Sequence, residues 1–172
     1  MILADLTSAT NRLRHRGPDD EGYLLVDIQG RRAFTAAGAD TVTSLQLPLV
    51  ESFQAQRIDA ALGFRRLSIL DLSEKGHQPL GSEDGSVWLA FNGEIYNFIE
   101  LRTELQKEGI SFKSGSDTEV LLAAYSHWGL SCLDRLIGMW AFALIDLRKR
   151  SVLICRDPFG IKPLFWTIHR GK

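Results

Sequence analysis

The sequence predicts an α+β domain whose sheets are largely antiparallel. Strand-like runs gather toward both ends of the 172-residue chain, and helical patterns gather in its middle. This segregation differs from the alternation of strands and helices that builds a parallel sheet. Two stacked sheets with helices outside would bury this many strands. The length suits a single domain over residues 1–172, without an internal linker or repeat.

The first half of the chain opens with an amphipathic helix. Its apolar face is expected to carry Ile2, Leu6, Ala9 and Leu13. Gly17-Pro18 ends this helix, because glycine followed by proline is a stop signal. Strand-like runs follow at 22–27, 32–36 and 60–69. The weakly patterned stretch 38–57 is expected to be a variable loop region.

The second half begins with an alternating, aromatic-rich strand at 86–91, which is expected to end at Asn92-Gly93. Two helical patterns follow at 98–109 and 117–129. Asp117-Thr118 supplies capping chemistry for the second of these helices. A short helix is expected around 132–137, and the last three strands are expected at 139–146, 151–156 and 163–168.

Composition excludes several classes of protein. The net charge of −1 provides no global field that would attract nucleic acid or an acidic membrane. The local basic run Arg148–Arg150 is interpreted as a solvated hairpin turn. No apolar run approaches the ~20 residues needed to span a bilayer, and no signal peptide is evident at the N-terminus. A soluble, cytoplasmic protein is therefore expected.

The cysteines and histidines predict neither a disulfide framework nor a metal site. Cys132 and Cys155 are far apart, lack metal-ligand spacing and are both expected to be buried. The four histidines are scattered, so nothing pairs them as a zinc site. A reducing compartment fits this cysteine usage. No metal or cofactor is expected in this domain.

Asn92-Gly93-Glu94 has two interpretations. An Asn-Gly pair permits positive φ and commonly forms a hairpin turn, in which Glu94 would be a solvated acid. Alternatively, the Asn92 amide and the Gly93 N–H face a developing oxyanion, and Glu94 offers a carboxylate to a cationic group. The three residues alone leave both interpretations open.

Arg65-Arg66, Asp117 and the basic turn 14–19 also carry chemistry. An arginine inside an apolar strand must be paired or must reach a cavity, and only one of the two can point inward along a strand. Its planar guanidinium suits a carboxylate held bidentately, and a structural ion pair is the alternative. Asp117 is either a helix cap or a binding group. The turn 14–19 lacks the surrounding positive charge that a nucleic-acid patch needs.

Six motifs, in this order and spacing, resemble the class II glutamine amidotransferases and, within them, the asparagine synthetase branch. The motifs are Arg-His-Arg-Gly-Pro-Asp at 14–19, Arg-Arg-Leu-Ser-Ile at 65–69, Asn-Gly-Glu-Ile-Tyr-Asn at 92–97, Gly-Ser-Asp-Thr-Glu at 115–119, Gly-Met-Trp-Ala-Phe-Ala at 138–143 and Arg-Asp-Pro-Phe-Gly-Ile-Lys-Pro-Leu at 156–164. They cover nearly the whole chain from residue 11 onward. One departure is Phe64, where the family often carries histidine.

The resemblance implies a four-layer αββα sandwich of the N-terminal-nucleophile hydrolase type that hydrolyses L-glutamine to L-glutamate and ammonia. Carried onto this sequence, it assigns the glutamine α-carboxylate to Arg66. It assigns the lining of the pocket, through backbone contacts, to Ile69 and Leu70. Glu94 and Asp117 would engage the α-ammonium group.

The resemblance also implies that Asn92-Gly93 forms the oxyanion hole over the side-chain amide. The family's nucleophile is an N-terminal cysteine whose own α-amino group serves as the base. This chain begins Met1-Ile2, so the first strand and the nucleophile are expected to be absent and the chain inactive. Cys132 and Cys155 match no catalytic position.

The family's synthetase domain, which uses ATP and Mg²⁺ to activate aspartate for asparagine biosynthesis, is likewise expected to be absent. The expected partners are L-glutamine or L-glutamate, a synthetase domain and a second copy in a homodimer, with no nucleic acid and no membrane. Two alternatives stay open. One is a non-catalytic glutamine-binding module, and the other is an amidotransferase domain that serves a different acceptor.

Overall fold

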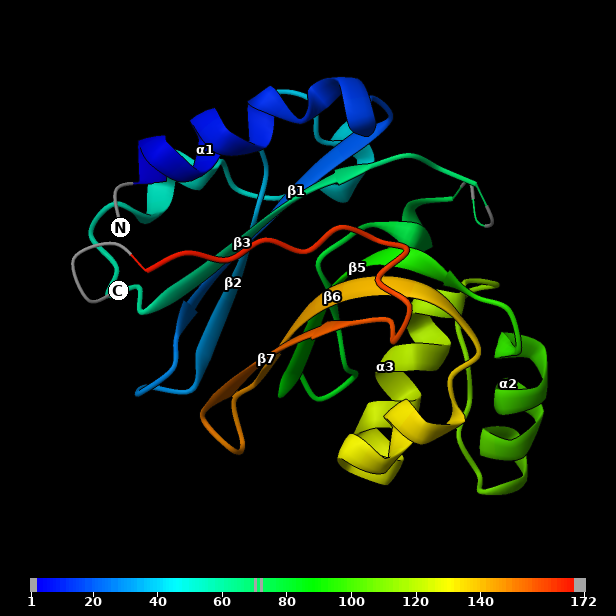
Figure 1. The fold of residues 1–172 in the computed structure, drawn as a ribbon. Coiled ribbons are helices and arrows are strands. Elements are labelled where there is room, and N and C mark those ends of the chain that lie inside the picture. The colour runs from blue at the N-terminus through cyan, green and yellow to red at the C-terminus, as the bar shows by residue number, and fades with distance from the viewer. Residues whose placement is uncertain (1–2, 70, 72, 169–172) are drawn as a thin grey trace.

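The computed structural model describes residues 3–69, 71 and 73–168, which form four stacked layers (Figure 1). One helix covers the outer face of a first sheet, a second sheet packs against the inner face, and two helices cover the far side of the second sheet. The predicted α+β class and αββα layering are therefore confirmed.

The first sheet has the strand order β2-β1-β3, and both pairings are antiparallel. Its strands are β1 (Asp20–Asp27), β2 (Arg32–Ala36) and β3 (Ala60–Arg66), and the helix above them is α1 (Leu3–Arg12). Short 3₁₀ turns lie in the connections at Arg14–Arg16, Thr43–Leu45, Val50–Phe53 and Glu74–Gly76.

The second sheet has the order β4-β5-β6-β7 and is also antiparallel. Its strands are β4 (Leu80–Gly81), β5 (Val87–Ile95), β6 (Gly138–Asp146) and β7 (Ser151–Arg156). Between β5 and β6 the chain forms α2 (Phe98–Lys107), α3 (Asp117–Trp128) and a 3₁₀ segment, Gly129–Arg135.

Three hydrophobic cores separate the four layers. Alternation along β1 sends Tyr23 and Leu25 toward the α1 side and Leu24 and Val26 toward the second sheet. The third core fills the space between the second sheet and α2 and α3, with Leu89 and other residues fully buried. The two faces of β1 are thus both interior, which explains why every residue of this strand is buried.

The face of α1 that meets the first sheet includes Leu6, as predicted, but is rotated away from Ala9 and Leu13. Leu3 and Leu6 pack into the core beneath it, and Thr10 is buried. Gly63 of β3 leaves room for the Thr10 hydroxyl, because a Cβ at this glycine would collide with it. The predicted residues outside this contact are Ala9 and Leu13, which are exposed, and Ile2, which lies outside the described residues.

Three further predictions were wrong in their details. Strand β3 ends at Arg66 rather than at residue 69, and the short helix is the 3₁₀ segment. Residues 163–168 form no strand, since no neighbouring strand pairs with them. Among the described residues, no helix combines the length and the apolar character needed to cross a bilayer.

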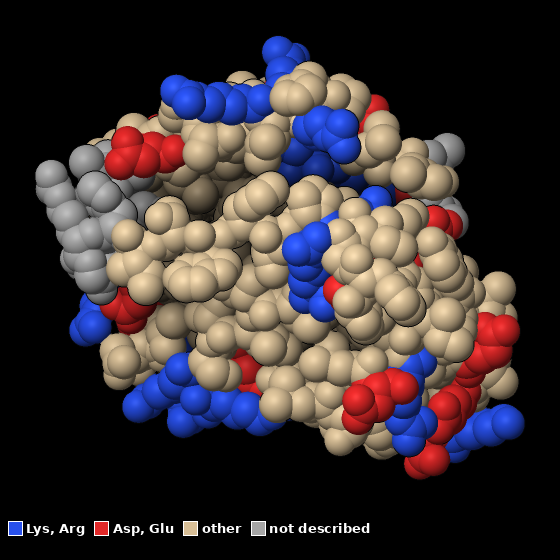
Figure 2. Space-filling view, viewed as in Figure 1, with Lys and Arg blue, Asp and Glu red and all other residues tan. Residues whose placement is uncertain are grey.

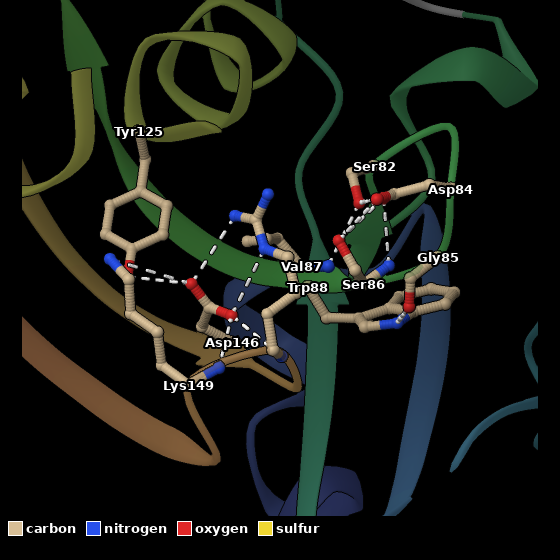
Figure 3. Close-up of polar contacts among 10 residues, drawn as sticks. Ser82, Asp84, Gly85, Ser86, Val87, Trp88, Tyr125, Asp146 and Lys149 are labelled. Atoms are coloured by element: carbon tan, nitrogen blue, oxygen red, sulfur yellow. Dashed lines mark hydrogen bonds and ion pairs between the residues drawn. The ribbon is translucent and has the colours of Figure 1, made fainter. Parts of the chain in front are cut away.

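The β6–β7 hairpin is closed by Asp146, whose side chain is fully buried (Figure 3). Its carboxylate accepts hydrogen bonds from the backbone N–H groups of Arg148 (2.9 Å) and Lys149 (3.0 Å) and from the hydroxyl of Tyr125 on α3 (3.3 Å). The predicted hairpin at the basic run 148–150 is confirmed. Its first two side chains are half exposed and lie near this carboxylate, so the run is not purely solvated.

A band of exposed apolar side chains follows β7 and the segment after it. This apolar band consists of Val152, Ile154, Phe159, Ile161, Phe165, Trp166 and Ile168. Both segments lie toward the viewer in Figure 1, and the same face in Figure 2 carries a broad area without charged side chains. Cys155 is also only partly buried, contrary to expectation.

Candidate functional site

Asn92, Gly93 and Glu94 lie inside β5, not in a turn. They pair across the ladder with Ala141, Trp140 and Met139 of β6. The strand therefore continues four residues beyond the predicted end at residue 91, because β6 supplies a partner along its whole length. The hairpin-turn interpretation of Asn-Gly is wrong.

The period of two along β5 places these side chains. Val87, Leu89, Phe91 and Ile95 belong to the core under α2 and α3. Asn92 and Glu94 therefore point to the opposite face, toward the first sheet. Asn92 is exposed and Glu94 is half buried.

Gly93 is required for a close approach rather than for positive φ. It has an extended strand conformation and is not among the glycines with positive φ. A Cβ at this position would collide with the carbonyl oxygen of Met139 and lie 2.8 Å from the Cα of Trp140. The expectation of positive φ is thus wrong, and steric contact across the ladder explains the residue.

The N–H of Gly93 points toward the open edge of β5. The backbone N–H and carbonyl of Trp140, its ladder partner, both form hydrogen bonds with Asp157 on the other side of β6. Gly93 and Trp140 are therefore a non-hydrogen-bonded pair. Along the same edge, the N–H of Phe91 donates to Gln78 Oε1 (2.7 Å). The neighbouring N–H groups of Phe91 and Ile95 on this edge have hydrogen-bond acceptors. The Gly93 N–H between them has no acceptor in the described part of the chain.

Asp117 occupies the next position along this edge. Its Oδ2 accepts a hydrogen bond from the N–H of Ile95 (3.0 Å), and the residue is 4% exposed. The cap of α3 is Ser116, whose Oγ accepts from the N–H of Glu119 (3.2 Å). Asp117 therefore joins α3 to the end of β5 instead of serving as the cap.

Two effects raise the pKa of Asp117 above its ordinary value of 3.8. The larger is burial, which penalises the charged carboxylate, and the charge of nearby Glu94 adds to it. The hydrogen bond from Ile95 opposes both but does not cancel them. A cation at this position would relieve the repulsion between the two carboxylates.

Arg66 belongs to the first sheet. It is 8% exposed at the end of β3, and its guanidinium donates to the carbonyl oxygens of Asp71 and Ser73, the latter at 2.9 Å. The Asp71 carboxylate accepts from the N–H of Gly115 (3.3 Å), so the loop that holds Arg66 contacts the segment leading into Asp117.

Arg66 also borders a hollow of about 340 Å³. Its other lining residues are Asp19, Asp20, Val42, Ser68, Ser73 and Glu74. A second hollow, of about 460 Å³, lies between β4, α3 and the 110–114 segment. Asn92, Gly93 and Glu94 line neither hollow, so their geometry rests on the strand edge described above.

The charges of the site are unpaired within the part of the chain that the structure describes. Its ion pairs include neither Arg66 nor Glu94 nor Asp117. The partners of Arg66 are neutral carbonyl groups. Neither the guanidinium nor the two carboxylates thus form an ion pair in the described part of the chain.

Arg65 has a separate, structural role. Its guanidinium is 2% exposed and binds Glu21 (2.5 Å) and Asp40 (2.8 Å) on the α1 side of the sheet. The prediction that only one arginine of the pair points inward is wrong, because both faces of β3 are covered by other elements. Both side chains are buried, on opposite sides of the strand.

Ile69 and Leu70 were predicted to line the pocket. Ile69 follows β3 and is 72% exposed, so its side chain contributes no buried wall. Leu70 lies outside the described residues.

The groups that hold the site together were not predicted from the sequence. The carbonyl groups of Asp71 and Ser73 fix Arg66, and the buried amide of Gln78 occupies an N–H at the edge of β5. The Asp-x-Ser pattern at 71–73, typical of a side-chain-stabilised turn, is the signal that could have identified this loop.

Neither cysteine approaches the site. Cys132 is completely buried beneath α3, and burial, with the charge of Cys155 second, raises the pKa of its thiol to about 11. Cys155 lies on β7, separated from β5 by β6. Among the described residues, no group of three or more His, Cys, Asp or Glu side chains could hold a metal ion.

Comparison with known proteins decides the family. The glutamine amidotransferase domain family matches residues 50–172. The chain belongs to this family. The phosphoribosylpyrophosphate amidotransferase of Bacillus subtilis, solved with ADP and GMP, has a TM-score of 0.68 at 23% identity. That alignment covers 92% of this glutamine amidotransferase domain and 35% of the solved chain, and it supports the fold.

Curated relatives of this amidotransferase domain include asparagine synthetases. Asparagine synthetase [glutamine-hydrolyzing] 1 of Bacillus subtilis is 42% identical over 153 residues, which is 89% of this chain and 19% of the relative. Amidase chry2 of Gibberella zeae is 31% identical, with 99% of this chain and 21% of the relative covered. The chain thus spans about a fifth of the length of these relatives.

Proposed function

We propose that this amidotransferase domain binds L-glutamine between the end of β5 and Arg66. The observation that carries the proposal is the charge pattern of the site. A guanidinium without a carboxylate partner and two adjacent carboxylates without a cation complement the zwitterionic end of an α-amino acid. Membership of a glutamine amidotransferase family supports glutamine as the substrate.

In this arrangement Arg66 binds the α-carboxylate bidentately, and its planar fork is already fixed by backbone carbonyls. Glu94 and Asp117 bind the α-ammonium group, which relieves their mutual repulsion. The backbone of Ile69 lines the pocket on the Arg66 side.

The far end of the substrate lies over Asn92-Gly93. The Gly93 N–H and the Asn92 amide donate to the side-chain carbonyl of glutamine, where negative charge develops during hydrolysis. Support for this role comes from the Gly93 N–H, which faces the open strand edge between the occupied N–H groups of Phe91 and Ile95. Preorganised donors of this kind stabilise an oxyanion because they need not reorient during reaction.

Glutamine affinity is expected to fall as the pH is lowered through the raised pKa of Asp117. The ammonium group needs an ionised carboxylate, and this carboxylate protonates above its ordinary value of 3.8 because of burial and Glu94. Binding restores the ionised form, so it should release protons near that pKa. Calorimetric titration in buffers of different ionisation enthalpy measures this release.

Asp117→Asn is the matched variant for this titration. It should bind glutamine more weakly and lose the proton release. Carboxylates whose pKa is lowered in the folded protein, such as Asp20, contribute fully to its stability above pH ~3.8. This contribution is lost as the pH falls further. Measurements from pH ~4.5 upward therefore test binding rather than unfolding, and proton release that persists in Asp117→Asn would contradict the assignment.

We infer further that this 172-residue chain does not itself hydrolyse glutamine. Its two cysteines are Cys132, which burial keeps as a thiol, and Cys155 on a distant strand. An ammonia-release assay is expected to give the background rate. Turnover that disappears in Cys132→Ala or Cys155→Ala would refute the inference.

We propose that this domain serves an asparagine synthetase, in which ammonia passes to aspartate in a synthetase domain that uses ATP and Mg²⁺. The similarity to asparagine synthetases supports this. We propose no cofactor for the present domain, and a homodimer as its assembly.

The similarity to an amidase supports a second candidate, an amidotransferase domain with a different acceptor. A glutamine-binding module without catalysis fits the positions of the two cysteines.

A further inference from the structure

The segment Gly17–Asp20 holds the backbone on both sides of Arg66, although the proposed function gives it no role. Gly17 packs so closely on the Arg65–Arg66 peptide that a Cβ would collide with it. The N–H of Asp19 donates to the carbonyl of Arg66 (3.1 Å), and the Asp19 carboxylate accepts from the N–H of Ser68 (2.8 Å). These contacts fix the main chain, and none of them involves the guanidinium.

The guanidinium is instead limited by Gly76. A Cβ on this residue would overlap Nη2 of Arg66, so the Gly76 backbone forms the wall against which the guanidinium rests. The same 3₁₀ turn supplies the carbonyl of Ser73 to Arg66. The position of the guanidinium therefore depends on where this turn lies relative to β3.

His77, the next residue, fixes the turn to the first sheet. Its Nδ1 lies 2.7 Å from Oδ2 of Asp20, which is 2% exposed and stands directly opposite Arg66 in the β1–β3 ladder. The other oxygen of Asp20 accepts from the N–H of Val42 (3.1 Å). The imidazole ring rests on Gly22, where a Cβ would lie 2.7 Å from Cε1 and Nε2.

We propose that His77, through its hydrogen bond to Asp20, positions the Arg66 guanidinium for the α-carboxylate of glutamine. This proposal rests on the proposed function. Contacts run without a break from Asp20 to His77, Gly76 and Arg66, and they begin and end on paired residues of neighbouring strands. His77 contacts neither Asn92 nor Glu94 in any described hydrogen bond, so it is a positioning residue.

Three variants of the 172-residue chain test the proposal. His77→Ala removes the contact with Asp20, and His77→Asn keeps a side-chain N–H donor close to the place of Nδ1. His127→Ala on α3 is the control for loss of a histidine, because His127 is not among the hydrogen-bond partners of Asp20 or Arg66 in the described part of the chain. Circular dichroism establishes that each variant is folded.

The first readout is the heteronuclear NMR signal of the Arg66 Nε–H, assigned by its loss in Arg66→Lys. We expect this signal to shift and broaden in His77→Ala and to stay near the wild-type position in His77→Asn and His127→Ala. An unchanged signal in a folded His77→Ala variant would overturn the proposal, whatever the chain binds.

The second readout is calorimetric titration with L-glutamine. His77→Ala should bind about tenfold more weakly, the change expected for one misaligned charge-assisted hydrogen bond, and His77→Asn should recover most of the affinity. If wild type binds and Arg66→Ala does not, but His77→Ala binds like wild type, the positioning role alone fails. If wild type does not bind glutamine, the proposed function fails as well.

Discussion

Replacement of Arg65 by alanine is expected to lower the free energy of unfolding by about 3–5 kcal/mol, because it strands a buried charge. Glu21 is 1% exposed and has Arg65 as its cationic partner. Its remaining donors, the Tyr23 hydroxyl and the N–H of Asp40, are neutral. Urea denaturation monitored by tryptophan fluorescence measures the loss.

Lys113→Ala is the control, since Lys113 pairs with Glu83 and both side chains are exposed. Removing this exposed pair should cost about 0–1 kcal/mol. Equal losses of unfolding free energy in the two variants would contradict the prediction that the buried ion pair contributes more than an exposed one.

Replacement of Arg66 by alanine is expected to weaken glutamine binding by about 100-fold, in keeping with the 2–5 kcal/mol typical of a truncated partner in a buried charge pair. The effect on folding should be far smaller than for Arg65, because its partners in the free protein are two backbone carbonyls rather than a buried carboxylate. Calorimetric titration and urea denaturation on the same preparation separate the two quantities.

Arg66→Lys sharpens this prediction. Lysine keeps the charge but lacks the planar fork, so its affinity should fall between those of wild type and Arg66→Ala. The adjacent arginines thus provide a crossed comparison in which one variant loses stability and the other loses binding. Full affinity in Arg66→Ala would contradict the site.

Local pattern predicted the elements whose limits are set locally. Strands β2 and β7 and helix α3 have the predicted starts, because turn residues and capping groups adjoin them. The limits of β5 depend on β6, which begins more than 40 residues later, so the sequence around Asn92 could not reveal them. Residues 163–168 show the converse, since a strand-like pattern without a pairing partner stays irregular.

The candidate site was predicted at the level of residue types and less well at the level of contacts. Glu94 lies near Asp117 at the end of β5, and the loop that holds Arg66 contacts the segment that leads into Asp117. Two-residue periodicity could not show that β3 has two buried faces, so the separate role of Arg65 was missed. The loop carbonyls that hold Arg66 are main-chain groups, and no side-chain pattern encodes their direction.

The two carbonyl contacts of Arg66 bear on the thermodynamics of substrate capture. An arginine side chain that is ordered only on binding loses about 1.5–2 kcal/mol of rotamer entropy at that moment. Here Asp71 and Ser73 restrict the side chain during folding, before any amino acid arrives. The cost is thus transferred from recognition to folding, and preorganisation of this kind raises affinity without adding a contact.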